Sequence, residues 1–275
     1  MPAMSFILHP GALVCAAMES LLQRGGLPLV IAHRGASAAA PENTLAAFEL
    51  ARTSGAHWLE TDVQPTADDV PVLLHDDDVD RTTDGSGAVR ELPAHDVAVL
   101  DAGSWFSGDF AGERVPELQQ LLAAPAMTDD GRRLLLELKG AHTARQVGAV
   151  IEVLRASGLD DRVLLQSFEV DVLRIVRELL PGRDIGLLVE DLHDDPVAVC
   201  RELGAVTYNP DHHRLLDRLV SSPDLVETLH AAGIAVMVYT ADDPAHWTAL
   251  VAAGVDGIIT NRPAELVQFL QQKVA

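Results

Sequence analysis

The chain has 275 residues, 48% of them hydrophobic, so it can bury a sizeable core in one large domain or two smaller ones. Acidic residues outnumber basic residues by 41 to 20, and the formal net charge at pH 7 is -21. Nucleic acids and anionic membrane surfaces repel such a chain and are excluded as main partners, whereas a small phosphorylated ligand responds to the local field of its pocket.

In chain order, residues 1–26 are expected to form an N-terminal extension. This segment is mildly apolar, but polar residues and a proline interrupt it, and it lacks the Lys- or Arg-rich start of an export signal. No stretch of the chain has the roughly eighteen uninterrupted apolar residues of a membrane span. Two cysteines, Cys15 and Cys200, provide no disulfide framework. These features predict a cytoplasmic protein without stable membrane insertion.

From residue 29 onward, short runs rich in Leu and β-branched residues alternate with segments of helical spacing. The runs are nearly continuous in hydrophobicity, as expected for strands of a parallel sheet that is covered on both faces. Several helical segments carry proline in or near the first turn, where its missing N–H is tolerated. The predicted strands are 29–32, 58–63, 70–74, 134–138, 163–166, 185–189, 205–208, 235–240 and 257–260, and the predicted helices are 43–53, 143–156, 169–180, 196–203, 223–232, 244–253 and 263–273.

Nine strands are one more than an eight-stranded barrel uses. Only about six residues join 58–63 to 70–74, whereas a parallel crossover needs about a dozen, so this pair is predicted to be an antiparallel hairpin. The other units predict an α/β fold, a (β/α)8 TIM-type barrel, in one catalytic domain over 27–275. Residues 76–116 have no strong period and are expected to form a small insertion after the second barrel strand. An open doubly wound sheet is the alternative, because counting strands does not show closure.

Polar residues stand at the ends of several predicted strands, which in a barrel meet at the mouth of the active site. Glu60 and Asp62 are two residues apart and share one face of a strand, and Glu137 and Lys139 do the same on the next barrel strand. Three carboxylates gathered at one rim repel one another unless a cation lies between them. Glu60, Asp62 and Glu137 therefore indicate an all-oxygen site for a hard divalent ion such as Mg²⁺ or Ca²⁺.

Other readings of these groups remain open. A single carboxylate at a strand end is more often a helix cap or an ion-pair partner, and only the convergence of several polar groups favours a site. Zinc is less favoured because no thiolate is near, although His33 or His75 could be recruited. The acidic run at 76–78 lacks the spacing of a calcium loop and is expected to be solvated. His212 and His213 are expected to be a surface pair. No partner or role is predicted for His57, His95, His142, His193, His230, His246, Asp101 and Asn261.

A series of short motifs runs through the chain in a fixed order. They are His33-Arg34-Gly35, Pro41-Glu42-Asn43-Thr44, Glu60-Thr61-Asp62-Val63, His75-Asp76, Arg81-Thr82-Thr83, Glu137-Leu138-Lys139, Gln166-Ser167-Phe168, Tyr239-Thr240 and Asp256-Gly257-Ile258-Ile259-Thr260. In these motifs the chain resembles the glycerophosphodiester phosphodiesterase family from about residue 29 to the C-terminus.

The resemblance implies a (β/α)8 barrel with a small insertion, a divalent metal, and hydrolysis of small-molecule glycerophosphodiesters to sn-glycerol 3-phosphate and an alcohol. It implies that one histidine removes a proton from the attacking oxygen while the other protonates the leaving alkoxide. The attacking oxygen is either the substrate's own glycerol 2-hydroxyl, which gives a cyclic phosphate, or water. The implied roles are metal ligation by Glu60, Asp62 and Glu137, acid–base catalysis by His33 and His75, and phosphate contacts by Arg34 and Lys139.

Three positions depart from the family pattern. Tyr239 replaces a tryptophan that packs against the glycerol end of the substrate, so Tyr239 is the expected substrate contact there. Asp69 stands where a turn glycine is usual, but Asp tolerates the left-handed conformation, so the hairpin is expected to form. Asn261 replaces an aspartate.

Two other enzyme classes compete with this interpretation. A phospholipase D-like barrel acting on lysophospholipids would use the same site, but it needs an apolar entry surface, for which the insertion offers Trp105, Phe106 and Phe110. A Mg²⁺-dependent barrel lyase would share the metal site, but it has no clear need for two rim histidines and Arg34. The residues leave open the head group, the ion, the order in which the two histidines act, and the oligomeric state.

Overall fold

The computed structural model describes residues 26–129 and 131–274. Except for Gly26, the expected N-terminal extension lies outside this described part, and so does Cys15. Within the described part, none of the helices combines the length and the apolar character that a membrane span requires.

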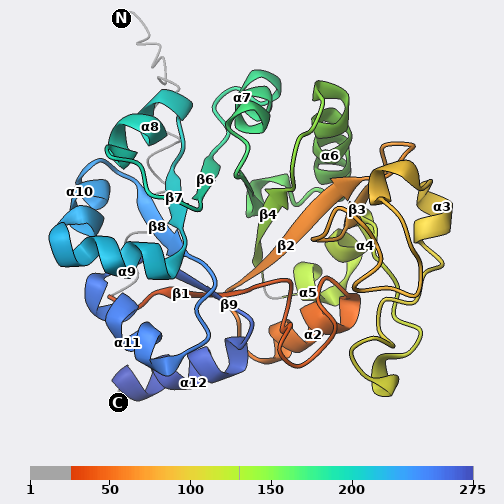
Figure 1. Cartoon of the computed structure of the whole chain (residues 1–275), viewed down its shortest axis with the longest axis horizontal. Helices are drawn as coiled ribbons and strands as arrows, with labels where there is room; N and C mark the ends of the chain where they lie inside the picture. Colours follow the sequence, from red (N-terminus) through yellow and green to blue (C-terminus); the bar gives the residue numbers. More distant parts are fainter. Residues whose placement is uncertain (1–25, 130, 275) are drawn as a thin grey trace, which may run out of the picture.

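The strands form a closed barrel, and the helices pack around its outside (Figure 1). β1 (Leu29–Ala32) pairs in parallel with β2 (Trp58–Pro65) on one side and with β9 (Gly257–Thr260) on the other, so the sheet closes on itself. The predicted (β/α)8 barrel is therefore confirmed, and the open doubly wound sheet is excluded. The other barrel strands are β4 (Arg133–Leu138), β5 (Val163–Ser167), β6 (Ile185–Val189), β7 (Thr207–Pro210) and β8 (Ala235–Val238).

One of the nine strands, β3 (Pro71–Leu73), lies outside the barrel, as predicted. It pairs antiparallel with the end of β2, with Leu73 opposite Val63. The turn between the two strands contains Asp69 at a φ of 59°, which is the left-handed conformation expected for this position. The short connection thus makes a hairpin, because it is too short for a crossover.

Each predicted helix is present, with bounds that shift by a few residues at most. The helix α9 (His212–Ser221) was not predicted, although Leu215, Leu216 and Leu219 recur in it at helical spacing between charged residues. Two short helices after the insertion, α4 (Leu118–Ala123) and α5 (Pro125–Thr128), were also missed. The others are α2 (Leu45–Thr53), α6 (Ala144–Ser157), α7 (Val170–Leu179), α8 (Pro196–Leu203), α10 (Leu225–Ala231), α11 (Pro244–Ala253) and α12 (Pro263–Val274), with a 3₁₀ turn η3 (Asp160–Arg162) before β5.

The insertion over residues 76–116 has a small apolar core of its own. It contains η1 (Val89–Glu91), α3 (Ala94–Val97) and η2 (Gly108–Phe110), which lie in the loops beside β3 and α4 (Figure 1). The carboxylate of Asp101, for which no role was predicted, ties one end of this segment by accepting three backbone N–H groups. The buried apolar residues that pack together here are Val72, Leu74, Val79, Val89, Val97, Ala102 and Val115.

The interior of the barrel changes from apolar to polar along the strands. On β2, Trp58, Glu60 and Asp62 alternate with outward residues and so lie on the same face. On β4, Leu135 and Glu137 follow the same pattern. The polar residues thus occupy the carboxyl ends of the strands, where barrel enzymes carry their active sites. The apolar layer is formed by Leu29, Ile31, Trp58, Leu135, Leu164, Met237 and Ile259.

Candidate active site

The turn after β1 carries His33 and Arg34 to the mouth of the barrel. Gly35 has a φ of 82°, and a Cβ at this position would lie 2.6 Å from the backbone carbonyl carbon of Ala47, so glycine is required. Arg34 itself has a φ of 55°, and its backbone N–H donates to Glu60 Oε2 over 3.0 Å. The close packing of this turn against α2 therefore places the motif beside the first carboxylate.

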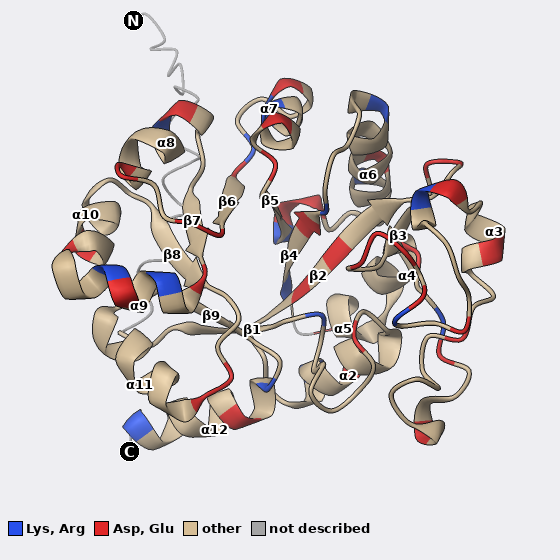
Figure 2. Cartoon of the chain, in the orientation of Figure 1, with Lys and Arg blue, Asp and Glu red and all other residues tan. Residues whose placement is uncertain are grey.

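Three buried carboxylates meet at the ends of β2 and β4. Glu60, Asp62 and Glu137 are 2%, 1% and 6% exposed, and Asp62 lies opposite Glu137 in the parallel register of the two strands. One oxygen of each carboxylate lies within 4.8 Å of one oxygen of each of the others. Figure 2 shows the acidic stretches of β2 and β4 near the centre of the molecule. The structure thus brings together the three predicted metal ligands.

Without a cation between them, the negative charges of these carboxylates repel one another. Burial and the other two carboxylates raise the pKa of Glu60 well above its usual value, and burial and Asp62 raise the pKa of Glu137. Burial also opposes ionisation of Asp62, but neighbouring positive charges, above all Arg34, outweigh it and lower the pKa to about 2. The buried Oδ1 of Asp62 accepts no hydrogen bond from the described residues. An all-oxygen set with this charge conflict fits a hard divalent cation.

Two cationic side chains flank the carboxylates. Arg34 Nε lies 3.2 Å from Asp62 Oδ2, and Arg34 Nη1 donates to Glu42 Oε1 over 2.8 Å. Lys139 Nζ lies 3.2 Å from Glu137 Oε1 and 3.9 Å from Asp62 Oδ1. Both predicted phosphate contacts are therefore positioned at the edge of the acidic cluster.

A chain of hydrogen bonds orients the ring of His33. Asn261 Nδ2 donates to Asp242 Oδ2 over 2.6 Å, so Asn261 Oδ1 faces the other way and lies 2.7 Å from His33 Nδ1. Because this amide oxygen is only an acceptor, His33 Nδ1 carries the proton and Nε2 is the basic nitrogen. Burial and the charge of Arg34 lower the pKa of His33 to about 4, so the ring is neutral near pH 7. Asn261 thus has a role that the sequence did not assign.

His75 follows β3 and is held by a second network of hydrogen bonds. Gln64 Nε2 donates to the backbone carbonyl of His75 over 3.2 Å, and His75 Nδ1 lies 2.7 Å from Asp76 Oδ1. Asp76 in turn pairs with Arg81, which also donates to both oxygens of Glu42. The prediction that the acidic run is merely solvated is therefore wrong for Asp76, which is tied into the site.

Asn43 is a further residue of the site that was quoted in a motif but given no role. It is 3% exposed and adopts a φ of 57° just before α2. Its Nδ2 donates to Asp62 Oδ2 over 3.0 Å, and its Oδ1 accepts from Thr61 Oγ1 over 2.7 Å. The Pro-Glu-Asn-Thr motif thus supplies one side chain that orients a carboxylate and another, Glu42, that links the two arginines.

Tyr239 lies in the loop that follows β8. Its ring packs edge-on against Phe168 with centroids 5.7 Å apart, and Lys139 Nζ lies 5.7 Å from the centroid of the Phe168 ring. The hydroxyl of Tyr239 donates to the backbone oxygen of Val189 over 2.8 Å. Through Phe168, the structure thus connects Tyr239 to the cationic edge of the acidic cluster.

Several histidines outside this site differ from expectation. His212 is 5% exposed rather than on the surface, because it begins a helix that starts directly after β7. His57 Nδ1 accepts the backbone N–H of Val30 over 2.8 Å, and His230 Nε2 lies 2.8 Å from Asp256 Oδ2. These partners come from residues distant in sequence, which explains why no pattern indicated them.

The comparisons with known proteins agree with this geometry. The model of the glycerophosphoryl diester phosphodiesterase family matches residues 33–265. A glycerophosphodiester phosphodiesterase from Caldanaerobacter subterraneus subsp. tengcongensis is 34% identical over 89% of this chain and 98% of its own length. A phosphodiesterase from Oleispira antarctica, solved with the product sn-glycerol-3-phosphate, superposes with a TM-score of 0.82 at 30% identity over 89% of this chain and 97% of that chain. A glycerophosphodiester phosphodiesterase from Agrobacterium tumefaciens superposes with a TM-score of 0.75 at 29% identity over 88% of this chain and 100% of that chain.

The resemblance predicted from the motifs is therefore confirmed over most of the chain. The family match spans the barrel from the histidine after β1 to the start of α12. The bacterial relatives align with this chain over nearly their whole length. This excludes the carbon–carbon lyase alternative. The chain belongs to the glycerophosphoryl diester phosphodiesterase family and is a phosphoric diester hydrolase.

Proposed function

We propose that the protein hydrolyses small-molecule glycerophosphodiesters to sn-glycerol 3-phosphate and an alcohol at the mouth of the barrel. The observation that carries the proposal is the cluster of Glu60, Asp62 and Glu137, buried at the ends of two adjacent strands and flanked by Arg34 and Lys139. The names of the relatives and the product complex of the Oleispira antarctica enzyme support this substrate class. The products belong to lipid and glycerol metabolism, and the low cysteine content supports a cytoplasmic location.

The three carboxylates would hold one divalent ion, Mg²⁺ or Ca²⁺. Their oxygen donors suit these hard cations, and an ion between them would relieve the repulsion that raises the pKa values of Glu60 and Glu137. When bound, the ion supplies positive charge that stabilises the negative charge developing on the phosphoryl oxygens.

Arg34 and Lys139 bind the substrate phosphate from the edge of this cluster. Arg34 is held between Asp62 and Glu42, so its guanidinium is oriented before the substrate arrives. Such preorganised cations stabilise the extra charge of the pentacoordinate transition state without reorganising during the reaction. Tyr239, beside Phe168, packs against the glycerol end of the substrate.

His33 and His75 form the acid–base pair. The hydrogen bond to Asn261 leaves Nε2 of His33 as its proton acceptor, and Asp76 orients the ring of His75 through Nδ1. After burial and Arg34, the charge of His75 also lowers the pKa of His33, which supports placing both rings in one site. One ring accepts the proton of the attacking hydroxyl and the other donates a proton to the leaving alkoxide.

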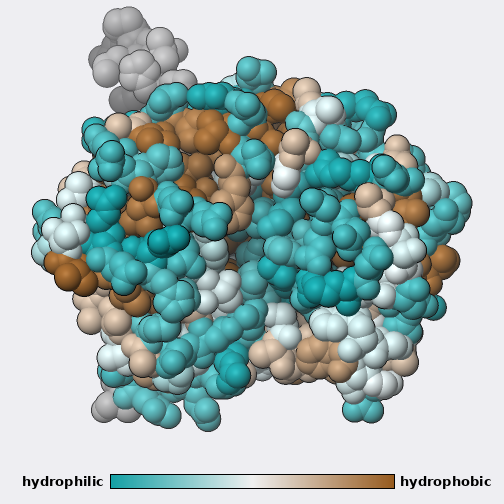
Figure 3. Space-filling view, viewed as in Figure 1, coloured by the Kyte–Doolittle hydropathy of each residue, from teal (hydrophilic) through white to brown (hydrophobic). Residues whose placement is uncertain are grey.

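A lysophospholipid substrate is the second candidate. Trp105, Phe106 and Phe110 in the insertion form edge-to-face pairs with centroids 5.6 Å apart, and Trp105 is 40% exposed. Hydrophilic residues nevertheless cover much of the molecular face drawn in Figure 3. This distribution favours a soluble diester over a lipid with an acyl chain.

A substrate panel separates the two candidates. Protein stripped with EDTA and reloaded with Mg²⁺ or Ca²⁺ would be incubated with glycerophosphocholine, glycerophosphoethanolamine and lysophosphatidylcholine, and released glycerol 3-phosphate and choline would be measured. We expect glycerol 3-phosphate from the two soluble diesters and little choline from the lysolipid. Choline from the lysolipid alone would favour the phospholipase D-like activity, and no product with either metal would refute both.

A further inference from the structure

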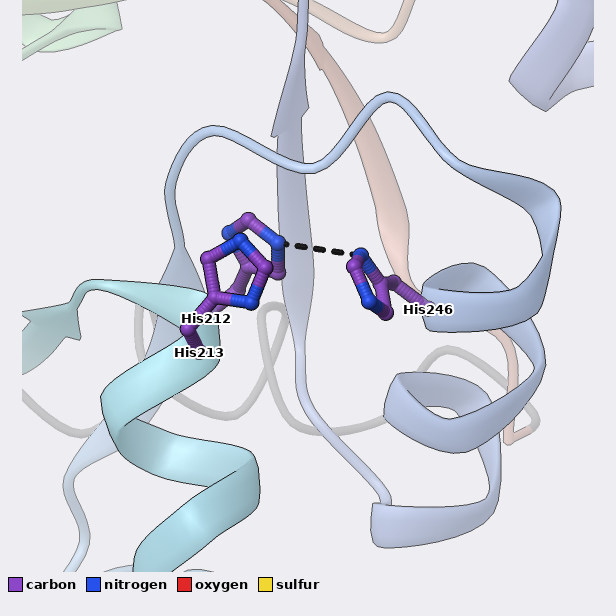
Figure 4. Close-up of side chains that lie close together, drawn as sticks. All are labelled: His212, His213 and His246. Atoms are coloured by element: carbon purple, nitrogen blue, oxygen red, sulfur yellow. Dashed lines mark hydrogen bonds between the residues drawn. The ribbon is translucent and has the colours of Figure 1, made fainter.

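Three histidines meet at the starts of two neighbouring helices, apart from the acidic cluster. His212 and His213 are the first two residues of α9, and His246 lies in the first turn of α11. One nitrogen of each ring lies within 4.8 Å of one nitrogen of each of the others. Figure 4 shows that the rings from the two helices face each other across the space between them.

His212 has the geometry of a preorganised metal ligand. Its Nδ1 lies 3.1 Å from the backbone oxygen of Tyr239, which is only an acceptor, so Nδ1 carries the proton and Nε2 is left with its lone pair. The backbone N–H of His212 donates to the same oxygen over 2.8 Å. Histidines that bind metals donate their second ring N–H to a carbonyl or carboxylate in this way.

The separations of the rings fit a tetrahedral ion. His212 Nε2 lies 3.2 Å from His246 Nδ1. Two zinc–nitrogen bonds of about 2.0–2.1 Å at a tetrahedral angle place their nitrogens about 3.3 Å apart. The ring of His213 has its centroid 3.9 Å from that of His212 and 4.8 Å from that of His246. His213 is exposed, so its ring can rotate to complete the set.

We propose that His212, His213 and His246 form a second metal site, which binds a divalent transition ion such as Zn²⁺ through three imidazoles. Imidazole ligands favour zinc, nickel and copper over Mg²⁺ and Ca²⁺, which prefer oxygen, so this site and the acidic site select different ions. The helix N-termini oppose a cation there, but the carboxylates of Asp211 and Asp243, which cap α9 and α11, offset them.

The position of the cluster also supports the site. An ion bound here joins the start of α9 to the start of α11 directly beside the backbone of Tyr239. The inference rests on this cluster alone and is independent of the substrate proposed above.

Zinc titration calorimetry of the full chain tests the site. The protein would be stripped with EDTA and titrated in excess Mg²⁺, so that the acidic cluster is occupied. We expect His213→Gln and His246→Ala each to weaken Zn²⁺ binding by at least about tenfold, because loss of even an outer-shell partner costs about 10–100-fold. His95→Ala, which changes an exposed histidine of the insertion, should bind as the wild type does.

A second variant separates this site from the acidic one. Glu137→Gln should keep the same zinc affinity, because the three imidazoles are unchanged. Co²⁺ added to the wild type should give the visible absorption of tetrahedral nitrogen ligation, and His246→Ala should lose it. Wild-type zinc affinity in both histidine variants, loss of the site in Glu137→Gln, or no zinc binding by the wild type would overturn the proposal. Both histidine changes are at positions that are not fully buried, and their folding is checked by metal-free thermal melting.

Discussion

The hydrogen bond from His33 to Asn261 offers a sharp test of the proposed acid–base pair. Asn261→Ala removes the acceptor that lies 2.7 Å from His33 Nδ1, so the ring loses the contact that selects its tautomer and orientation. Leaving a buried donor without a partner costs about 1–3 kcal/mol. If this free energy is added to the activation barrier, kcat decreases by about 5–150-fold, since each 1.36 kcal/mol is tenfold in rate.

The pH profile distinguishes this positioning role from a loss of folding. The hydrogen bond to Asn261 raises the pKa of His33, against the larger lowering by burial and by Arg34. Its removal therefore lowers the pKa of His33 further, and the acidic limb of kcat/KM moves to lower pH. Asn261→Asp should move this limb the other way, because a carboxylate beside Nδ1 favours the charged ring.

Ser37→Ala is the matched control. Ser37 Oγ donates to Asn261 Oδ1 over 2.7 Å and to the backbone oxygen of His33 over 2.8 Å, but it makes no hydrogen bond to the ring of His33. We expect its kcat and pH profile to stay within about twofold of the wild type. Unchanged kcat and an unchanged acidic limb in Asn261→Ala would refute the assigned role of the hydrogen bond.

Four further predictions concern the metal cluster, the first turn and acid stability. Glu137→Gln should lower turnover by orders of magnitude. It should nevertheless raise the melting temperature of the EDTA-treated protein at pH 7, because the raised pKa of Glu137 means that its charge destabilises the metal-free fold. A lower melting temperature would contradict this. EDTA should abolish wild-type activity, and Mg²⁺ or Ca²⁺ should restore it. Gly35→Ala should destabilise the protein by more than about 2 kcal/mol in urea unfolding, because it adds a clash with Ala47 to the strain of positive φ, whereas Gly112→Ala has a φ of 93° but open space and should cost only about 1 kcal/mol. Arg81 and the other partners of Asp76 lower its pKa to about 2, so its contribution to stability is complete above about pH 4 and is lost as the pH falls toward 2; Asp76→Asn should flatten the pH dependence of unfolding in that range, and an unchanged slope would contradict the assignment.

The closed barrel and its acidic rim could be predicted because both follow from local patterns. Strand periodicity places Glu60 and Asp62 on one face, and the short connection to residues 70–74 identifies the hairpin without knowledge of the fold. Glu137 was found by the same alternation on the next barrel strand. These inferences need only spacing along one segment and the rule that barrel sites lie at the carboxyl ends of strands.

The residues that the sequence missed act across segments. Asn261 contacts His33 because β9 closes the barrel beside β1, and this pairing joins positions 228 apart in the chain. Likewise, Glu42 meets Arg81 of the insertion across 39 positions. The histidine cluster needed the start of α9, a helix that was not predicted, to lie beside the start of α11. Partners of this kind depend on tertiary closure rather than on local spacing.

The placement of charge explains how so acidic a protein can act on an anionic substrate. The chain has two lysines, and one of them, Lys139, lies against Glu137 and Asp62. With a divalent ion, Lys139 and Arg34 bring four positive charges against three carboxylates, so the site becomes locally positive inside a chain of formal charge -21. Without the ion, burial and mutual repulsion raise the pKa values of Glu60 and Glu137. Arg34 and Lys139 then form ion pairs with the carboxylates. Metal loading therefore changes the availability of Arg34 and Lys139 for phosphate, and the affinity for sn-glycerol 3-phosphate should depend on the metal even where no bond is broken.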